Sequence, residues 1–374
     1  MAKAQAKVKA HYKKLISSDS HIREPHDLWS KRLLSKFGER TPRVVKDPAG
    51  RKGDFFYNGI GLTKIGKVEQ EFARHFPQFR DAAFDPVARL AFQDQAKIAG
   101  EIINPTQMSN IMPGKDAEMI RAAATVLNDF MIEFCSADPK RLIGNAVIPM
   151  HDVAWAVKEA ERVRRAGLAG VIVNILAPEG CLPYRHASYD RFWAAVSSLR
   201  MPVTLHIITG RVLDPILYAV TEEERAAAPA VLLDLFREVE IPLANDFIFG
   251  GILDRHRKLD LVCGEFELAW IPNFLWRIDQ IQEDFAYLLN VKKTRLKPSE
   301  YVTTRIYHGL ISDPHYLEII KKYGADNIVW GTDFPHIRAI GLDAQEQAKK
   351  MFGKLPAATQ EKIVGGIVAR LYTN

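Results

Sequence analysis

Short apolar segments alternate with amphipathic segments along most of this chain. Consecutive apolar positions, as in 170–174 (Gly-Val-Ile-Val-Asn), are typical of parallel strands that are buried on both faces. Positions 153–166 instead carry apolar residues at helical spacing, with Asp152 suited to the N-cap and Gly167 suited to the residue after the last turn. The alternation therefore predicts a succession of strand–helix units.

The same pattern extends over the whole chain. It predicts strands at 16–21, 101–105, 141–149, 170–174, 202–206, 259–265, 305–308 and 327–333. It predicts helices at 85–100, 116–135, 152–167, 189–199, 229–239, 247–256, 272–289, 314–323 and 357–372. Such an α/β order favours a (β/α)8 TIM barrel. The competing fold, a doubly wound open sheet, would normally carry a Gly-rich phosphate turn after the first strand, where this chain has Ser-Asp-Ser-His.

Two segments fall outside this alternation. Residues 1–14 hold five lysines and no acidic residue, and we expect a solvated basic N-terminal arm. Residues 15–374 are expected to form a single metal-dependent barrel domain. Within it, residues from about 25 to 84 are rich in Pro, Gly, Phe and charge, which indicates a long irregular insertion after strand 1 that covers the substrate.

The composition excludes several classes of protein. Hydrophobic residues make up 47% of the chain, as in an ordinary globular domain. The three cysteines are far apart, so neither a disulfide framework nor a cysteine zinc site is indicated, which fits a reducing compartment. There is no long apolar run. We therefore expect a cytoplasmic protein without membrane or nucleic-acid partners, in spite of a net charge of +6.

Residues of metal-ligand type lie at or just after the ends of five predicted strands. They are Asp19, His21 and Glu24 at the first strand, His206 at the fifth, Glu265 at the sixth, His308 at the seventh and Asp333 at the eighth. In a barrel, the carboxyl ends of the strands meet at one face. Asp19 and His21 share one side of their strand because side chains alternate with a period of two. Carboxylates and imidazoles without thiolates predict a divalent transition metal: zinc, manganese or iron.

Several motifs together resemble the amidohydrolase-related family. They are 19–25 (Asp-Ser-His-Ile-Arg-Glu-Pro), His206 after Pro202-Val203, 331–336 (Gly-Thr-Asp-Phe-Pro-His), and the tail from Ile363 to Tyr372. The matching branch includes the aminocarboxymuconate semialdehyde and dihydroxybenzoate decarboxylases. The resemblance implies a metal-dependent barrel enzyme whose ion is held by Asp19, His21, His206 and Asp333. It also implies an oligomer, made of identical chains or containing a related subunit.

The first functional hypothesis is metal-assisted hydrolysis or non-oxidative decarboxylation of a small organic substrate. Asp333, His206 and Glu265 are the candidate catalytic residues, as ligand and proton acceptor or as acid and base. The candidates for binding the substrate are Arg23, His186 and His336. Surface arginines such as Arg185 have the same potential to hold a carboxylate.

Two alternatives remain open from the sequence. The decarboxylase relatives often have His followed by a glycine run where this chain has Glu265-Phe266-Glu267. Together with Glu24 and His308, the chain then offers more ligands than one ion needs, so one ion or two is expected. Two iron or manganese ions would make the chain a dinuclear oxygenase (hydroxylase). The other alternative is a non-catalytic subunit of an assembly.

Overall fold

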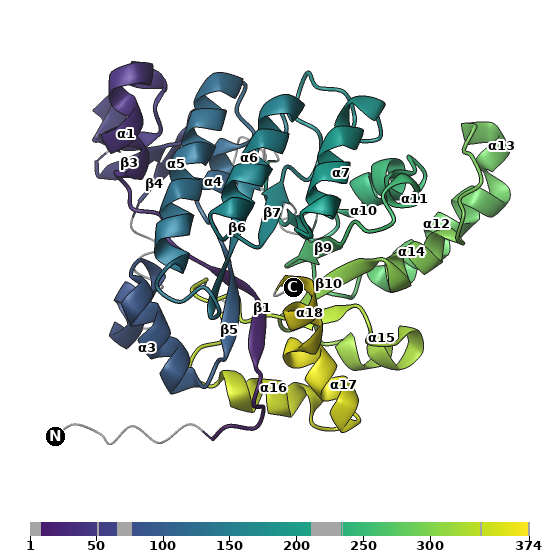
Figure 1. Cartoon of the computed structure of the whole chain (residues 1–374). Helices are drawn as coiled ribbons and strands as arrows, with labels where there is room; N and C mark the ends of the chain where they lie inside the picture. The colour runs from purple at the N-terminus through teal and green to yellow at the C-terminus, as the bar shows by residue number, and fades with distance from the viewer. Residues whose placement is uncertain are drawn as a thin grey trace.

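Eight parallel strands form the central sheet of the computed structural model (Figure 1), which describes residues 9–50, 52–65, 77–210, 233, 235–336 and 339–372. In sheet order the strands are β1 (Ile16–His21), β5 (Gly100–Asn104), β6 (Leu142–Ile148), β7 (Gly170–Val173), β8 (Val203–His206), β9 (Leu261–Gly264), β10 (Ile306–Leu310) and β11 (Ile328–Trp330). All eight were expected from the sequence, within a few residues at each end.

The first and last strands meet and close the barrel. Ser20 forms a parallel bridge with Phe334. The Asp333 amide donates to the Asp19 carbonyl at 2.8 Å, and the His21 amide donates to the Phe334 carbonyl at 2.6 Å. The (β/α)8 barrel predicted from the strand–helix alternation is therefore confirmed, and the motifs at the two ends of the chain lie side by side.

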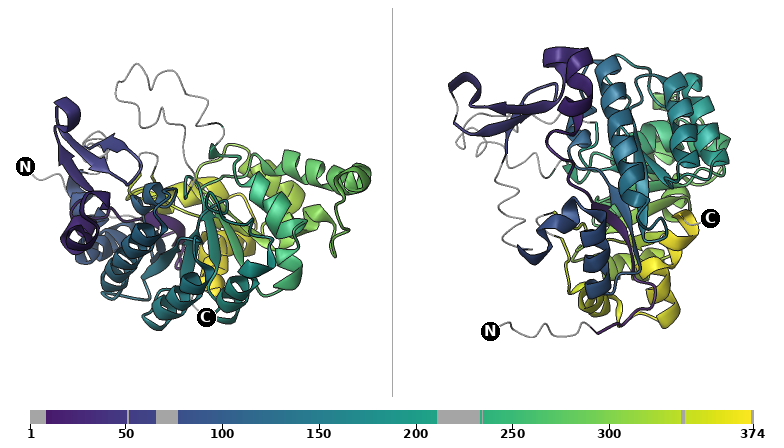
Figure 2. Two further views of the ribbon diagram at one scale, coloured as in Figure 1. Left: turned by 90° about the horizontal axis from the view of Figure 1, so that it is seen from above. Right: turned by 60° about the vertical axis from the view of Figure 1, so that its left-hand side comes forward.

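Helices surround the barrel (Figures 1 and 2). The larger ones are α3 (Pro86–Ala96), α5 (Ala117–Cys135), α6 (Val153–Arg165), α7 (Asp190–Ser198), α12 (Ile271–Asp284), α14 (Pro298–Thr304), α15 (Tyr316–Tyr323) and α16 (Ala344–Phe352). Two of these, α14 and α16, were not expected from the sequence. The side chain of Asp152 caps α6 by accepting from the Ala154 and Trp155 amides, as its position in the sequence indicated. Shorter helices are α4 (Met108–Ile111), α10 (Glu240–Pro242), α11 (Ile252–Arg255), α13 (Ala286–Leu289), α17 (Ala357–Glu361) and α18 (Ile367–Tyr372).

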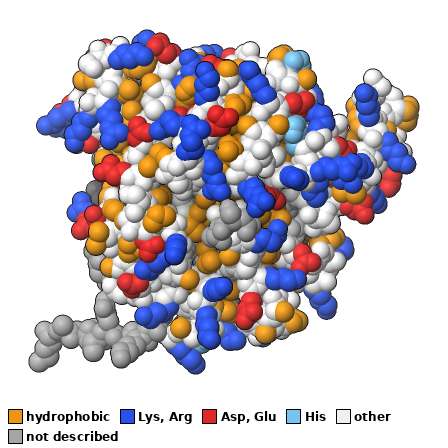
Figure 3. All heavy atoms as spheres, in the orientation of Figure 1, with side chains coloured by type: hydrophobic (Ala, Val, Ile, Leu, Met, Phe, Trp, Pro, Cys, Tyr) orange, Lys and Arg blue, Asp and Glu red, His pale blue; other side chains and the backbone are white. Residues whose placement is uncertain are grey.

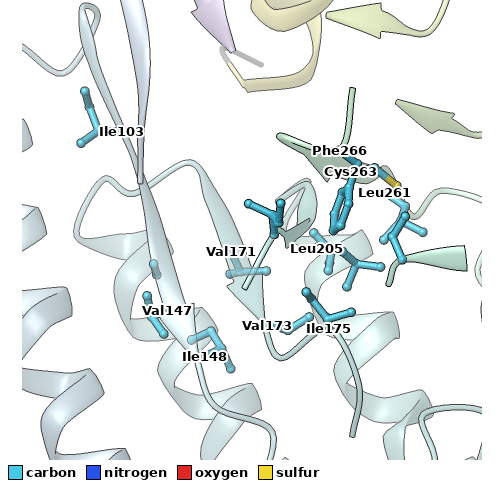
Figure 4. Packing of buried hydrophobic residues seen from close by; sticks show 14 of the residues in the cluster. Ile103, Val147, Ile148, Val171, Val173, Ile175, Leu205, Leu261, Cys263 and Phe266 are labelled. Atoms are coloured by element: carbon cyan, nitrogen blue, oxygen red, sulfur yellow. The ribbon is translucent and has the colours of Figure 1, made fainter. Parts of the chain in front are cut away.

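Two apolar layers hold the strands in place. The outer layer packs the strands against the helices, and Figure 4 shows part of it, including Val171, Leu205 and Leu261. The inner layer lies inside the barrel, where Ile102, Val262 and other side chains near the starts of the strands pack on α18. The last helix, α18, therefore closes the end of the barrel where the strands begin. The opposite end, where the strands finish, is the one that can hold polar side chains.

The insertion after β1 is more regular than we expected. It contains α1 (Leu28–Phe37) and an antiparallel sheet of β2 (Arg43–Lys46), β3 (Asp54–Tyr57) and β4 (Leu62–Lys64). The Asn58 side chain accepts from the Ile60 and Gly61 amides and so builds the turn between β3 and β4. Strands of three or four residues are too short to show a clear period of two, which is why the sequence pattern missed them.

Four predicted helices differ from the structure, and the one expected at 357–372 is divided into α17, a π-helical turn (Lys362–Gly366) and α18. The helix expected at 272–289 breaks at Phe285 into α12 and α13. Residues 247–256 instead hold the end of a π-helical turn, η6 (Leu243–Ile248), and α11, separated by Gly251 at a φ of 75°. Of the helix expected at 229–239, residues 233 and 235–239 are described, and 236–239 form a turn rather than a helix; most of the basic arm lies outside the described residues. Among the helices that the structure describes, none is long and apolar enough to cross a membrane.

Candidate metal centre

A bulge in β1 turns Asp19 and His21 into the barrel. Ser17 pairs with Glu101 and Ser20 with Ile103, so the register shifts between them. Ile16 belongs to the inner layer, and a regular strand would then place residues 19 and 21 on the outer face. The extra residue reverses the phase, and the outward Ser20 hydroxyl instead donates to Glu101 at 2.9 Å. The shared side of Asp19 and His21 was predictable, whereas the bulge that turns this side inward was not.

Asp19, His21, His206 and Glu265 form one group of ligand-type side chains. One ligand atom from each lies within 4.8 Å of all the others. The His206 Nε2 atom is 3.3 Å from Asp19 Oδ2 and 3.7 Å from Glu265 Oε2. The first three side chains are 3–5% exposed, whereas Glu265 is 22% exposed. Asp19, His21 and His206 thus form the buried part of the group, and Glu265 lies on the side that is open to solvent.

Asp333 and His336 extend this group. Together with His21 and Glu265 they form a second set whose ligand atoms lie within 4.8 Å of one another. His336 Nδ1 lies 2.7 Å from Asp333 Oδ1, and its ring packs against that of His21 at 4.0 Å between centroids, tilted by 34°. His336 was expected to bind substrate, and its side chain is 24% exposed beside the buried Asp333.

The orientation of His21 indicates a cation. Its Nδ1 atom is 2.8 Å from the Pro105 carbonyl, which can only accept, so Nδ1 carries the proton. Nε2 then presents a lone pair, is buried and has no hydrogen-bond partner among the residues that the structure describes. It lies 3.3 Å from Asp19 Oδ1 and 3.6 Å from Asp333 Oδ1. A lone pair facing two carboxylates in a buried site needs a positive charge between them, and the donor set of imidazoles and carboxylates suits a divalent transition metal.

The pKa values of the group reflect burial and mutual charge. Burial and the nearby His336 lower the pKa of His21, which keeps its ring neutral. Burial opposes the charged form of His206, but the Asp19 and Glu265 carboxylates raise the pKa of that ring to about 9. Burial and the Asp333 charge raise the pKa of Glu265 to about 8. Without a cation, this protein must therefore hold protons at a site that is crowded with carboxylates.

Backbone strain is concentrated at the ends of the strands that carry these groups. Glu265 and Asp333, which follow β9 and β11, have φ values of 65° and 54°, and Ile208, just after β8, has 72°. A β-branched residue in this region is unusual, and such conformations cluster at functional sites. The backbone is therefore strained at the carboxyl-terminal ends of these strands, where the ligand-type side chains gather.

Glu24 does not join the ligand groups. Its buried carboxylate accepts from the backbone amides of Thr106, Gln107 and Met108, at distances from 2.9 to 3.2 Å. Burial raises its pKa, while these amides act in the opposite direction. The expectation that Glu24 is a metal ligand is therefore corrected: it anchors the segment after β5, whose Pro105 carbonyl orients His21.

His308 also lies elsewhere. β10 continues to Leu310, so His308 is in the middle of the strand rather than at its end. Its neighbour Tyr307 faces the inner layer, which turns His308 outward. There its Nε2 is 2.8 Å from the Val302 carbonyl, and its ring packs edge-on against Trp270. The expectation that His308 is a metal ligand is wrong because the strand extends two residues further than its apolar pattern indicated.

The other residues expected to bind substrate have different surroundings. The Arg23 side chain is buried, and its amide donates to the Ala83 carbonyl at 2.8 Å. His186 is exposed and accepts from the Ser188 amide at the start of a short 3-10 helix. Arg185 pairs with Asp246 at 2.9 Å. Neither Arg23 nor His186 is in the two ligand groups found among the described residues.

Two sets of residues that hold the site in place were not predicted from the sequence: Asn104, and the pair of Arg89 and Glu101. Asn104, the last residue of β5, donates to Asp19 Oδ1 at 2.7 Å and orients that carboxylate. Arg89 and Glu101 form a fully buried ion pair at 3.2 Å on the outer side of β1. Arg89 also donates to the His21 carbonyl and lies 4.6 Å from the centre of the Phe334 ring. Because these residues join segments far apart in the chain, local patterns could not identify them.

Comparisons with known proteins agree with this fold. The chain is 27% identical over 233 residues to gamma-resorcylate decarboxylase of Polaromonas sp. (strain JS666), covering 59% of this chain and 68% of that protein. Among solved structures, an amidohydrolase from Mycobacterium avium subsp. paratuberculosis matches with a TM-score of 0.78 at 20% identity, covering 97% of this chain and 100% of that one. The manganese-bound 5-carboxyvanillate decarboxylase of Novosphingobium aromaticivorans matches with a TM-score of 0.71 at 17% identity, and each chain is fully covered.

A family model shows to which family this chain belongs. The amidohydrolase model matches residues 70–373, which is most of the chain and includes every strand of the barrel except β1. The resemblance expected from the strand-end motifs is thus confirmed, and the chain belongs to the amidohydrolase family.

Proposed function

We propose that this protein is a divalent-metal-dependent decarboxylase acting on a small aromatic carboxylate. The observation that carries the proposal is the buried Nε2 of His21, which has no hydrogen-bond partner in the described part of the chain and faces the carboxylates of Asp19 and Asp333. Two of the relatives named above are a gamma-resorcylate decarboxylase and a 5-carboxyvanillate decarboxylase, and the latter contains manganese. These names support a hydroxylated aromatic acid as the substrate class.

Asp19, His21, His206 and Asp333 would hold the ion, with Glu265 beside them. When bound, a divalent metal supplies Lewis-acid chemistry toward the oxygens of the substrate. The more exposed Glu265 and His336, at 22% and 24%, lie where a substrate can enter. The buried ligands keep water away from the other side.

Asp333 and His336 are suited to provide the proton that decarboxylation requires. The bond between the ring carbon and the carboxylate carbon breaks, carbon dioxide leaves, and the electron pair stays on the ring carbon. That carbon must then receive one proton. Burial opposes the charged form of His336, but the nearby Asp333 raises its pKa, so the pair holds a proton across its 2.7 Å contact. We assign the transfer to the Asp333 carboxyl group.

The proposal is tested with manganese-loaded protein and 2,6-dihydroxybenzoate, followed by detection of 1,3-dihydroxybenzene and carbon dioxide. We expect product from the wild type, and a loss of about 10²-fold or more in kcat for Asp333→Asn, calculated per metal-loaded chain so that lost metal is not counted as lost proton transfer. His308→Phe is the matched control, because that histidine lies outside the barrel mouth. No decarboxylation of any hydroxybenzoate by metal-loaded protein would contradict the proposal, and turnover of amides instead would favour hydrolysis.

A second candidate is oxygen chemistry at two metal ions. The observation that favours it is the pair of overlapping ligand groups, which share His21 and Glu265. A carboxylate such as Glu265 could then bridge the ions. The test is metal content and oxygen uptake of protein purified without oxygen. Two ions per chain including iron, together with oxygen consumption, would support this candidate. One ion and no oxygen consumption would exclude it.

A further inference from the structure

Tyr372, the last residue of α18, places its side chain inside the barrel. It is 6% exposed and belongs to the inner layer, together with Ile102 and Val262. α18 lies near the centre of the view in Figure 1, and Figure 3 shows the mixture of hydrophobic and charged side chains on the same face of the molecule. The tail from Ile363 to Tyr372 carries part of the family resemblance, yet nothing in the proposed function uses the hydroxyl group of this tyrosine.

Two buried asparagines extend from a candidate metal ligand into the barrel. Asn104 Nδ2 donates to Asp19 Oδ1 at 2.7 Å, and Asn145 Nδ2 donates to Asn104 Oδ1 at 2.8 Å. Asn104 ends β5, Asn145 lies in the neighbouring β6, and both side chains are buried. Two consecutive amides therefore form a chain of hydrogen bonds that ends on the Asp19 carboxylate.

The other end of this chain meets Tyr372 beside Gly170. A Cβ atom at Gly170 would lie 2.2 Å from Asn145 Oδ1 and 2.8 Å from Tyr372 Cε1, so the glycine leaves room for both side chains. Asn145 Oδ1 is buried and forms no hydrogen bond of regular geometry with any other residue in the described ranges. The Tyr372 hydroxyl also lies 3.4 Å from Thr204 Oγ1. Burial raises the pKa of Tyr372 to about 12, although hydrogen bonding with Thr204 and Asn145 lowers it, so the hydroxyl keeps its proton and can donate.

The hydrogen-bonding capacity of these groups fixes the direction of the chain. An asparagine amide accepts at one end and donates at the other, and the two ends are nearly equal in shape. A carboxylate that binds a cation can only accept, so Asn104 must turn its Nδ2 toward Asp19 and its Oδ1 toward Asn145. Asn145 must then turn its own Nδ2 toward Asn104. Its Oδ1 is left as a buried acceptor that needs a donor, and the Tyr372 hydroxyl is the donor beside it.

We propose that Tyr372 is a positioning residue, whose hydroxyl group sets the orientation of both amides and, through them, of the Asp19 carboxylate. The inference rests on the proposed metal site. Without the hydroxyl, the Asn145 amide is free to turn over, and Asn104 then follows and presents Oδ1 to Asp19, where two acceptors repel each other. The last helix is thereby coupled to the metal centre through side chains of β5 and β6.

Metal titration of the full-length protein measures this coupling. Tyr372→Phe removes one hydroxyl group and keeps the ring, and we expect it to weaken manganese binding about tenfold, as for other groups that orient a metal ligand. Thr204→Val is the matched control, because it removes the other partner of the same hydroxyl and leaves Tyr372 to donate to Asn145. Tyr307→Phe removes a second hydroxyl of the inner layer, which accepts from Arg370 at 3.1 Å. Both controls should bind manganese like the wild type.

A double variant separates a chain of hydrogen bonds from a loss of packing. Asn145→Leu interrupts the chain between Tyr372 and Asn104, so adding Tyr372→Phe to it should weaken manganese binding no further. Two effects that multiply would overturn the proposal, and so would a Tyr372→Phe variant with wild-type affinity. Thermal melting of the metal-free proteins shows whether each variant is folded.

NMR spectroscopy of metal-free protein labelled at asparagine tests the same chain without a metal. The side-chain amide signals of Asn104, assigned by their loss in Asn104→Leu, should shift in Tyr372→Phe and stay in place in Tyr307→Phe. Unchanged Asn104 signals in Tyr372→Phe would overturn the proposal whether or not the protein binds manganese. A wild type that binds no manganese, with the shift present, would support the chain and contradict the proposed function alone.

Discussion

The buried ion pair between Arg89 and Glu101 is predicted to stabilise the barrel beside β1, where the first and last strands meet. Both side chains are fully buried, and the Arg89 Nη1 atom lies 3.2 Å from Glu101 Oε2. Arg89 also donates to the Ala82 carbonyl at 2.8 Å and to the His21 carbonyl. Burial lowers the pKa of Arg89 while Glu101 raises it, so Glu101 offsets part of the cost of burying the guanidinium charge.

Replacement of Arg89 by Met tests this role. It leaves the Glu101 carboxylate buried, with Ser20 Oγ at 2.9 Å and Gln93 Nε2 at 2.7 Å as its remaining donors. Removal of one partner of a buried pair costs about 3–5 kcal/mol of unfolding free energy. Because the His21 carbonyl also loses its donor, we expect weaker metal binding in the same variant, by about tenfold or more.

The assay is urea unfolding, followed by tryptophan fluorescence and circular dichroism, with metal affinity measured separately by titration. Arg40→Met is the matched control, since Arg40 forms a similar pair with Asp116 but is exposed, and no measurable change is expected. Adding Glu101→Gln to Arg89→Met removes the unpaired charge and should recover part of the loss. A single Arg89→Met variant as stable as the wild type would refute this reasoning.

Three further predictions concern the surroundings of the site. Burial lowers the pKa of His308 to about 4, so its contribution to stability is complete above about pH 6.5 and is lost as the pH falls toward 4. His308→Phe should remove up to about 3 kcal/mol of this acid sensitivity, measured by urea unfolding at several pH values, and should leave metal binding unchanged. Asn104→Leu should weaken metal affinity by about 10–100-fold in a titration, because Asp19 loses a donor at 2.7 Å. Glu24→Ala should lower the thermal midpoint and the metal affinity together, since the amides of 106–108 lose their shared acceptor; an unchanged affinity would contradict its role in orienting His21.

The strand order and most of the candidate site could be predicted because they depend on local patterns. Parallel strands that are buried on both faces have continuous apolar runs, and a barrel brings their ends together. Asp19, His206 and Asp333 were therefore placed correctly at one end of the barrel, and the structure brings them close together with Glu265 and His336.

What could not be predicted depends on features that a local pattern does not contain. The bulge in β1 decides which way Asp19 faces, and it appears only in the pairing with β5. His308 was misplaced because β10 extends to Leu310 across a polar residue and a glycine. Glu24 has the residue type of a ligand, but the amides that it binds come from a segment about eighty residues away in the chain.

Metal content per chain is the most direct test of the central claim that Asp19, His21, His206 and Asp333 hold a divalent metal. The protein is dialysed against manganese, then against buffer, and analysed by elemental mass spectrometry. We predict at least one ion per chain in the wild type and in His308→Phe, and less than one tenth of that in His206→Ala and Asp333→Asn. Equal metal content in all four proteins, or none in the wild type, would contradict the claim.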